Sequence, residues 1–503
     1  MYRESGTTRW AAVIGVLSGA VSLLNAGCRS VDPETPVTQQ AVSAYSGLAA
    51  TTSLLTTSDN NLKTVSHTKE TNAPALLMTD ATIDLEVSLR LAGADNPTIN
   101  LARERVNEAL ADQLAARSLL LPSVNVGGNY RRHQGAVQGD AGIIQPSNLQ
   151  SLDLGLGTSI IGSGTAAIPG VRLFAHLGDA AYEPLAARQR VTARGSDARA
   201  VQNQILLEVA VAYLDLIGAE ARLEILRRGE TEIAEIVRIT GEFARTGQGK
   251  PSDANRSLAN AELVRRQFRQ AEGTQAVASA RLTRLLNLNP ATTLKTPGGE
   301  VELLTLVDAN TELETLLTTA LRNRPELLAR TAEISEAQVR VRQEKTRPLL
   351  PTLSVGYSAT GFGGGNTSTG SLATRSDVDV VAVWSFENLG LGNRARVRNA
   401  GAIVGQTVSA YEAAVNQVRS EVASAQANAQ AATQQCNTAL AAVTAAGEGY
   451  KLERDRTMQG EGLPIEGLDS FRQLLDARQE LLRAVIAANA AQFRLLIAIG
   501  NQP

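Results

Sequence analysis

Two long stretches of the chain carry apolar residues at alternating steps of four and three, the heptad pattern of helices that pack side by side. The seam of the first stretch consists of Ile205, Val209, Ala212, Leu216, Ala219, Leu223 and Leu226. The seam of the second consists of Val404, Val408, Tyr411, Val415, Val418 and Val422. The first stretch predicts a helix from about Leu185 to Arg245, roughly 90 Å long. Gly and Pro then mark turns into return helices at about Ser252–Leu288 and Ile465–Ile499.

Shorter segments alternate apolar with polar residues, which is the period of a strand with two different faces. They predict strands at about 122–133, 166–176, 351–362 and 376–386. Strands of about 10 residues with one apolar face suit a membrane barrel with a polar lumen, and Tyr357 and Trp384 suit its aromatic girdles. A soluble sandwich alternates in the same way, but it has no use for two helices of about 60 residues. The polar, Gly-rich segments at about Arg131–Gly164 and Gly361–Ser376 are expected to be exposed loops.

The whole pattern occurs twice, in a first repeat at 76–300 and a second repeat at 301–503. The segment "LLLPSVNVGGNY" matches "PLLPTLSVGYSA", and "LFAHLGDA" matches "SFENLGLG". The helical intervals Phe174–Gly247 and Phe386–Gly460 span 73 and 74 residues. The strand intervals Pro122–Phe174 and Pro351–Phe386 span 52 and 35 residues, a difference of 17. The length of the rods is therefore kept in both repeats, while the strand region is free to vary.

Each hairpin turn has the pattern Gly-x-Gly-x-Pro-x-acid, in "TGQGKPSD" and in "QGEGLPIE". The tips are therefore predicted near 247–253 and 460–466. Pro251 and Pro464 suit the first position of a helix, and an acidic residue two positions later suits the positive end of the helix dipole. The turns can be explained by this structural role alone, and a further role for the acids is a separate hypothesis.

The N-terminal segment has the features of an export signal, because Arg3 and Arg9 precede the apolar run Ala11–Leu24 and small residues follow. Cys28, directly after Ala-Gly, is similar to the acylated cysteine of a bacterial lipobox. We therefore expect residues 1–27 to be a lipoprotein signal peptide and Cys28 to carry palmitate or a similar acyl chain. Residues 28–75, rich in Ser, Thr and Pro, are expected to be a lipidated linker. The alternative is an ordinary cleaved signal with an incidental cysteine.

Composition argues against several classes of function. The 503-residue chain has a formal net charge of −2 and offers no electrostatic basis for binding nucleic acid. His67, His133 and His176 lack the spacing of metal ligands, and Cys436 is expected to be an unpaired thiol within a helix. The sequence shows no catalytic constellation, so we predict a protein that is not an enzyme and that has no cofactor and no metal site.

The order of these elements resembles that of the TolC-like outer-membrane efflux proteins, over about Asp80–Asn501. The resemblance rests on the paired segments "NPTINLARERV" and "RPELLARTAEI", on "FENLGLGNRARVRNA" and "GLPIEGLDS", and on "ARQELLRAVIAANAAQFRLLIAIG". It implies a mainly α fold with a β-barrel portion, built from two tandem helix–strand–strand–helix repeats. It also implies a homotrimer in which every subunit gives four strands to a shared twelve-strand barrel and in which the long hairpins form a periplasmic tunnel.

The resemblance further implies a lipid-anchored outer-membrane duct for efflux or export, with its helical part in the periplasm. Its partners would be a periplasmic adaptor and an inner-membrane pump. Glu466 and Asp469 match two acidic residues that ring the periplasmic gate of such ducts, and Asp253 matches an acidic position of the other hairpin. Gly247 and Gly460 match the glycines of the turns that contact the adaptor.

The sequence departs from the family pattern at Gly462, where a basic residue often ties the gate shut; Lys250, on the first turn, is a candidate to replace it. The alternative function is a periplasmic lipoprotein adaptor, which also carries helical hairpins. Adaptors usually have one hairpin beside a small domain. Two hairpins with paired amphipathic strands favour the duct.

Overall fold

The computed structural model describes residues 80–139, 141–160, 166–298, 301–308, 310–367, 370–459 and 462–503. The chain divides into two units, Met1–Ala75 and Leu76–Pro503, and all of the described residues belong to the second. The expectations for the signal peptide, for Cys28, for the linker 28–75 and for Gly460 lie outside the described residues.

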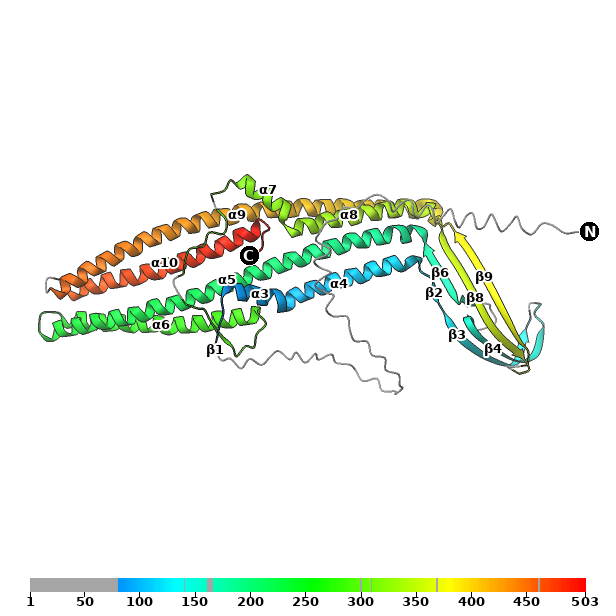
Figure 1. Ribbon diagram of the computed structural model, residues 1–503, viewed down its shortest axis with the longest axis horizontal. Coiled ribbons are helices and arrows are strands. Elements are labelled where there is room, and N and C mark those ends of the chain that lie inside the picture. Colours follow the sequence, from blue (N-terminus) through cyan, green and yellow to red (C-terminus); the bar gives the residue numbers. More distant parts are fainter. Residues whose placement is uncertain are drawn as a thin grey trace, which may run out of the picture. The chain divides into compact units, whose positions relative to one another are not determined.

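Four long helices form two hairpins (Figure 1). They are α5 (Leu177–Arg245, 69 residues), α6 (Pro251–Leu285, 35 residues), α9 (Leu391–Met458, 68 residues) and α10 (Pro464–Ala498, 35 residues). α5 begins before the expected Leu185, and Pro184 lies inside it. A proline within a helix removes one backbone hydrogen bond, which made a start after Pro184 the simpler expectation. The neighbouring turns of a very long packed helix tolerate this single loss.

Each strand region is preceded by a pair of shorter helices. The pairs are α3 (Leu85–Asp95) with α4 (Pro97–Arg117), and α7 (Leu313–Asn323) with α8 (Pro325–Thr346). In both pairs a proline opens the second helix, where its missing N–H removes no helical hydrogen bond. The Asn96 side chain accepts a hydrogen bond from Thr98 N–H at 2.9 Å and donates one to Leu285 O at 2.9 Å. The break between α3 and α4 is thereby fixed to the end of α6.

Short elements join these helices to the strands and to each other. They are η1 (Ser118–Leu120), η2 (Arg347–Leu349), η3 (Glu387–Gly390) and the parallel pair β1 (Asp80–Thr82) and β7 (Thr293–Lys295).

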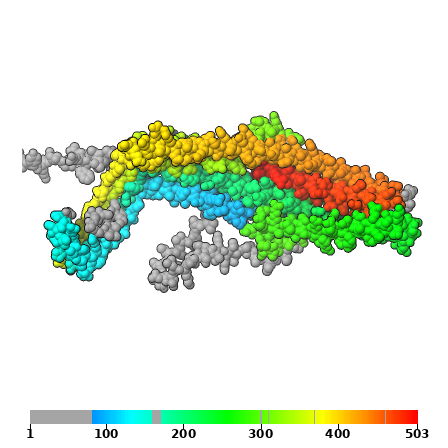
Figure 2. All heavy atoms as spheres, turned by 180° about the vertical axis from the view of Figure 1, so that it is seen from behind, coloured from blue at the N-terminus to red at the C-terminus, as the bar shows by residue number. Residues whose placement is uncertain are grey.

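α10 lies between α9 and the α5–α6 hairpin (Figure 2). Its Leu495 packs in a buried cluster with Val422 of α9, and its Phe493 packs in another with Leu214 of α5. By length and composition alone α10 is apolar enough to cross a membrane, because its most apolar stretch has a mean hydropathy of 1.4. However, 61% of that stretch is buried inside the protein. Packing against two neighbouring helices accounts for this apolar character.

One face of the helical layer carries a second layer, formed by α3, α7 and residues 301–308. Leu85 and Leu89 of α3 meet Leu304 over the seam between α5 and α10. The segment 301–308 crosses α10, where Asn489 Oδ1 accepts a hydrogen bond from Leu304 N–H at 2.8 Å. Gln492 Oε1 accepts another from Val307 N–H at 3.0 Å. Because both acceptors are buried, the segment is held by hydrogen bonds that water does not weaken.

The strands form a four-stranded antiparallel arrangement. Its members are β2 (Ser123–Val124), β3 (Val126–Gln138), β4 (Ile144–Ile160), β5 (Ala166–Pro169), β6 (Val171–His176), β8 (Thr352–Gly365) and β9 (Leu372–Val383). β2 and β3 make up the first strand, β4 and β6 the second, β8 the third and β9 the fourth. Among the described residues, β3 pairs with β4 alone and β9 with β8 alone, so both edges of this sheet are open.

The second strand is interrupted. Leu156 of β4 pairs with Ala359 of β8, and Val171 of β6 pairs with Tyr357, only two residues further along β8. The end of β4, residues Gly157–Ile160, pairs instead with β5 in a separate antiparallel ladder. Gly170 ends this insertion, and a Cβ there would lie 2.4 Å from the carbonyl carbon of Leu156. The insertion supplies most of the 17 residues by which the two strand intervals differ.

The register separates an apolar from a polar face of the sheet. Residues that pair directly across strands lie on the same face. Val126, Leu156 and Ala359 form one such row, and Leu173, Val355 and Val380 form another. The opposite face carries the row Phe174, Ser354 and Val381 and the row Asn129, Asp153 and Phe362, together with Asp377 and Asp379.

Two expected loops are largely strand. In the segment Arg131–Gly164, β3 continues to Gln138 and β4 begins at Ile144, so the second strand starts well before the expected residue 166. In the segment Gly361–Ser376, β8 continues to Gly365 and β9 begins at Leu372. Strand pairing uses backbone groups, which polar and Gly-rich residues also possess, so these strands extend beyond their apolar parts.

Candidate functional site at the hairpin tips

The first tip, between α5 and α6, is a tight turn that depends on glycine. Gly247 has a φ of +78°, a left-handed conformation that residues with a Cβ rarely adopt. Gly249 N–H donates to Phe243 O at 2.8 Å and closes the turn on the end of α5. Lys250 is the exposed N-cap residue, and Asp253 N–H donates to Lys250 O at 3.0 Å in the first turn of α6.

The second tip, between α9 and α10, enters its return helix in the same way. Glu466 N–H donates to Leu463 O at 3.0 Å, as Asp253 does to Lys250. Gly462 is buried, and a Cβ there would lie 3.3 Å from Thr457 N, so a side chain would require its neighbours to shift by a few tenths of an ångström. Leu463 is 54% exposed, although it is apolar.

The two tips are held together by a buried cluster behind them. Phe471 and Leu468 of α10 pack with Ile233 and Leu226 of α5, and all four are at most 2% exposed. The Tyr450 ring of α9 tilts against Phe471 with 6.0 Å between ring centroids, and burial raises the pKa of its phenol. This apolar cluster gives the two hairpins one shared base.

The acids of the tips lie at the surface. Glu466 and Asp469 are both exposed and stand three residues apart on α10, which places them on one helix face. Asp469 lies 3.9 Å from Arg472, and Asp253 lies 3.8 Å from Arg256 on α6. The structure thus brings Glu466 and Asp469 together and places Asp253 on the other hairpin.

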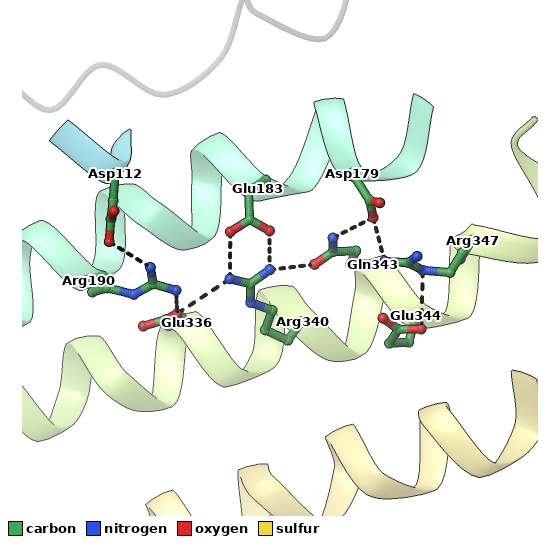
Figure 3. A network of polar contacts seen from close by, with 9 residues as sticks. All are labelled: Asp112, Asp179, Glu183, Arg190, Glu336, Arg340, Gln343, Glu344 and Arg347. Carbon is green, nitrogen blue, oxygen red and sulfur yellow. Dashed lines mark hydrogen bonds and ion pairs between the residues drawn. The ribbon is translucent and has the colours of Figure 1, made fainter. Parts of the chain in front are cut away.

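A second polar cluster, which we call the ion-pair ladder, joins α5 to α8 near the sheet (Figure 3). Arg340 of α8 makes two hydrogen bonds to Glu183 of α5, one of them at 2.7 Å from Nη2 to Oε1. Arg190 of α5 donates to Glu336 at 2.7 Å and lies 3.4 Å from Asp112 of α4. Asp179 contacts Gln343 at 2.8 Å and Arg347 at 2.5 Å, and Arg347 contacts Glu344 at 3.3 Å. Arg340 links these groups into one network through Gln343 at 3.0 Å and Glu336 at 3.8 Å.

The electrostatics of the ladder favour its charged form. Hydrogen bonding from Arg340 holds the pKa of the Glu183 carboxyl below its usual value, against the opposing effect of burial. Hydrogen bonding to Glu336 raises the pKa of Arg190 in the same way. The sequence analysis missed the ladder. The sequence did contain a signal for it, a row of charged residues three and four positions apart between 336 and 347. The charges of this row are opposite to those of Asp179, Glu183 and Arg190 on α5.

Comparison with other proteins shows which family has this combination of helical hairpins and an antiparallel sheet. A family model described as "Outer membrane efflux protein" matches residues 89–288 and 316–501. The chain belongs to this family. A search of curated protein sequences finds no match for it.

Solved structures show the same fold for this efflux-family chain. The outer-membrane channel OprN has 20% sequence identity and a TM-score of 0.66, covering 83% of this chain and 90% of its own. The CmeC outer-membrane channel of Campylobacter jejuni has 17% identity and a TM-score of 0.66, covering 89% and 94%. The MtrE channel of Neisseria gonorrhoeae, in its open state, has 19% identity and a TM-score of 0.62, covering 83% and 89%.

Family and fold confirm the resemblance found in the sequence. The chain is a mainly α protein of the outer-membrane efflux family with a β-sheet portion, and its relatives are channels rather than enzymes. The adaptor alternative is not favoured, since both hairpins and the sheet fall within the matched fold. Cys436 is a free, buried thiol, as expected.

Proposed function

We propose that this efflux-family chain is one subunit of a trimeric outer-membrane duct, through which solutes pass passively and whose periplasmic end is gated by the hairpin tips. The observation that carries the proposal is the amphipathic sheet with two open edges. Its apolar face suits lipid and its polar face suits a wet lumen. Four strands cannot close, and an open edge cannot face hydrocarbon, so copies of the chain must pair edge to edge.

Several exposed side chains support this placement of the sheet. Val126, Val378 and Val380 are 74%, 71% and 66% exposed in the single chain and lie on the apolar face. Tyr357 and Trp384, 42% and 54% exposed, suit the interfacial girdles. Burial in lipid and between subunits would remove this apolar surface from water.

The gate is proposed to be an acidic ring. Glu466 and Asp469 from three subunits would bring six carboxylates close together at the constriction, with Asp253 contributing from the other hairpin. Such a ring raises the local concentration of cations and repels anions. The close packing at Gly462, where a Cβ would lie 3.3 Å from Thr457 N, supports closing contacts that differ from the family's usual basic tie.

The partners proposed are a periplasmic adaptor, met by the turns at Gly247 and Gly460, and an inner-membrane pump that supplies the energy. The exposed Leu463 beside the second turn supports a protein contact there. A fatty acyl chain on Cys28 would hold the subunit to the outer membrane.

The proposal is tested by single-channel recording of the purified protein in planar bilayers, for wild type and for Glu466→Ala with Asp469→Ala. We expect a small, cation-selective wild-type conductance that rises or loses its selectivity in the double variant. Unchanged conductance would keep the duct and remove the acidic gate. A folded trimer without any channel activity would overturn the duct, and water-soluble behaviour without detergent would instead support an adaptor.

A further inference from the structure

Two adjoining hollows lie along the seam between α5 and α10. The first, of about 550 Å³, is lined by residues of α5, α6 and α10. The second, of about 490 Å³, is lined by residues of α5, α8, α9 and α10. Arg494 lines both, so we treat them as one recess, the arginine recess. Along α5 it runs from Ala200 to Arg222, a distance of about 33 Å in an α-helix.

The first hollow is rich in positive charge. It is lined by one carboxylate, Asp215, and by four guanidinium groups, those of Arg222, Arg281, Arg483 and Arg494. Arg281 is paired with Asp215 at 2.8 Å, and Arg483 with Glu480 at 2.8 Å.

Two of these arginines keep an uncompensated charge. Arg222 Nε donates to the neutral Gln479 at 3.2 Å. In the described part of the chain, no carboxylate lies within ion-pair distance of Arg222 or Arg494. Both side chains can therefore offer donors to an anion in the recess.

The recess opens on the face that is turned away from the second layer. On α5, Leu206, Val209 and Leu216 pack in the cluster that includes α3, whereas Gln204, Asp215 and Arg222 line the recess. These two sets lie on different sides of the helix. In a closed ring of helices the outer side has the larger circumference, so a second layer fits there. In the proposed duct the recess therefore lies on the opposite side, the inner wall.

The spacing along α10 leads to the same assignment. Asp469 and Arg483 are 14 residues apart, and Glu466 and Arg494 are 28 apart, which are two and four heptads. Residues a whole number of heptads apart share a face of a supercoiled helix. The arginines thus face the same side as the proposed gate acids, deeper in the duct.

The second hollow adds one buried polar atom that lacks a partner. Arg324 is 7% exposed, but it is ion-paired with Glu326 and Glu421, which line the same hollow, so its charge is compensated. Asn203 is 6% exposed, and its Oδ1 is without a hydrogen-bond partner in the described chain. A buried polar atom of this kind usually finds a partner in a ligand or in water.

We propose that the arginine recess binds anionic solutes on the inner wall of the duct at two points, Arg494 and Arg222, which lie about 18 Å apart along the seam and each hold one acidic group. The solute class is an organic anion that also carries a hydrogen-bond donor, such as a hydroxyl or an amide, for Asn203. The inference rests on the proposed duct. It assigns the arginine zone a preference opposite to that of the acidic tips, so solutes bearing both charges would be favoured at successive points.

The test is single-channel recording with inorganic tripolyphosphate as the probe, added to each side of the bilayer in turn. We compare wild type with Arg222→Gln, Arg494→Gln and the double variant. The wild-type channel should show current block that saturates with probe concentration. In the double variant each point loses one charge-assisted hydrogen bond to the probe, so the half-blocking concentration should rise by about tenfold. The reversal potential in a KCl gradient should shift toward cation selectivity.

The matched control is Arg90→Gln with Arg322→Gln, which removes two exposed arginines from α3 and α7 of the second layer. It changes net charge equally and should leave block and selectivity as in wild type. An open channel whose block is the same in all variants, or is weakened equally by the control, overturns the arginine recess but keeps the duct. Protein that forms no channel at all overturns the proposed function itself.

Discussion

At the scale of single residues, Gly170 marks the point where the insertion in the second strand returns to the sheet. A Cβ at this position would lie within 2.6 Å of three atoms of Leu156, two of them backbone atoms. Neither backbone can move without breaking the pairing of β4 and β6 with β8. We expect Gly170→Ala to destabilise the fold by about 1–3 kcal/mol, the usual cost of an overpacked site. The measurement is the thermal midpoint of the detergent-solubilised protein.

The matched control for this prediction is Gly241→Ala. Gly241 lies inside α5, and a Cβ there meets nothing within 4 Å. Alanine should therefore stabilise the helix by about 0.5–1 kcal/mol. If Gly170→Ala raises the thermal midpoint as Gly241→Ala does, a Cβ at Gly170 does not clash with Leu156 and the prediction is wrong.

Residue chemistry could be predicted from the sequence only where the local chain dictates it. The turn at Gly247 and the prolines at the first turns of α6 and α10 follow from local pattern and were expected. Gly170 is explained by a neighbour that pairing brings close, and local pattern carries no sign of it. The role of Glu466 and Asp469 stays a prediction, because exposure on one helix face suits a gate and a solvated surface equally.

At the scale of elements, the ion-pair ladder couples α5 to α8 where both approach the sheet. A double-mutant cycle with Arg340→Ala and Glu183→Ala should give a coupling free energy of about 1–3 kcal/mol, because the pair is half-buried and bonded twice. Chemical unfolding followed by circular dichroism measures it. The same cycle on Arg265 and Glu262, an exposed pair of α6 at 2.7 Å, should give little coupling. Equal coupling in both cycles would contradict a special role for the ladder.

The ladder also predicts a dependence on pH. The pKa of Glu183 is lowered in the folded protein from an ordinary value of 4.5. Its contribution to stability is therefore complete above about pH 4.5 and is lost as the pH falls through the lower, folded value. Wild type should lose stability on acidification below pH 4.5 more steeply than Glu183→Gln, measured as thermal midpoints across that range. Parallel curves for the two proteins would show that other carboxyl groups dominate.

The long helices could be predicted because a heptad seam repeats over many turns, so local errors average out. The strands could be predicted only in part. Leu152, Leu154 and Leu156 alternate with Asp153 and Gly155, which is a strand signal inside the segment taken as a loop. The Gly-rich composition of that segment outweighed it. The split of the second strand was beyond reach, since it depends on pairing with β8.

At the scale of the whole molecule, the two faces of the sheet should respond differently to charge. Val380 lies on the apolar face and Val381 on the polar face, and both are exposed in the single chain, at 66% and 49%. In the proposed barrel, Val380→Lys would face lipid at a cost of about 2–4 kcal/mol near the bilayer centre. We expect Val380→Lys to reduce the yield of membrane-inserted trimer, and Val381→Lys to insert normally. The assay is heat-modifiable migration of protein extracted from outer membranes.

The reverse result would place the apolar face toward the lumen and would contradict the barrel. Equal loss in both variants would show that neither face meets water. The closure of the barrel was the hardest feature to predict from the sequence, because it requires strand edges from other copies of the chain. The pattern within one chain indicates only which face of each strand is apolar.

The helices α5 and α9 have 69 and 68 residues. The number of residues in each determines both how far the helix reaches and in which direction its end points. One residue inserted into an α-helix advances its end by about 1.5 Å but turns everything beyond it by about 100°. A single insertion in either rod would therefore barely change where its tip ends. It would swing the seam residues out of register with their neighbours and aim the tip at a different partner. Because α5 and α9 themselves differ by one residue, the two repeats share their reach to within about 1.5 Å but not the direction in which their ends point, so each tip is aimed at its own partner.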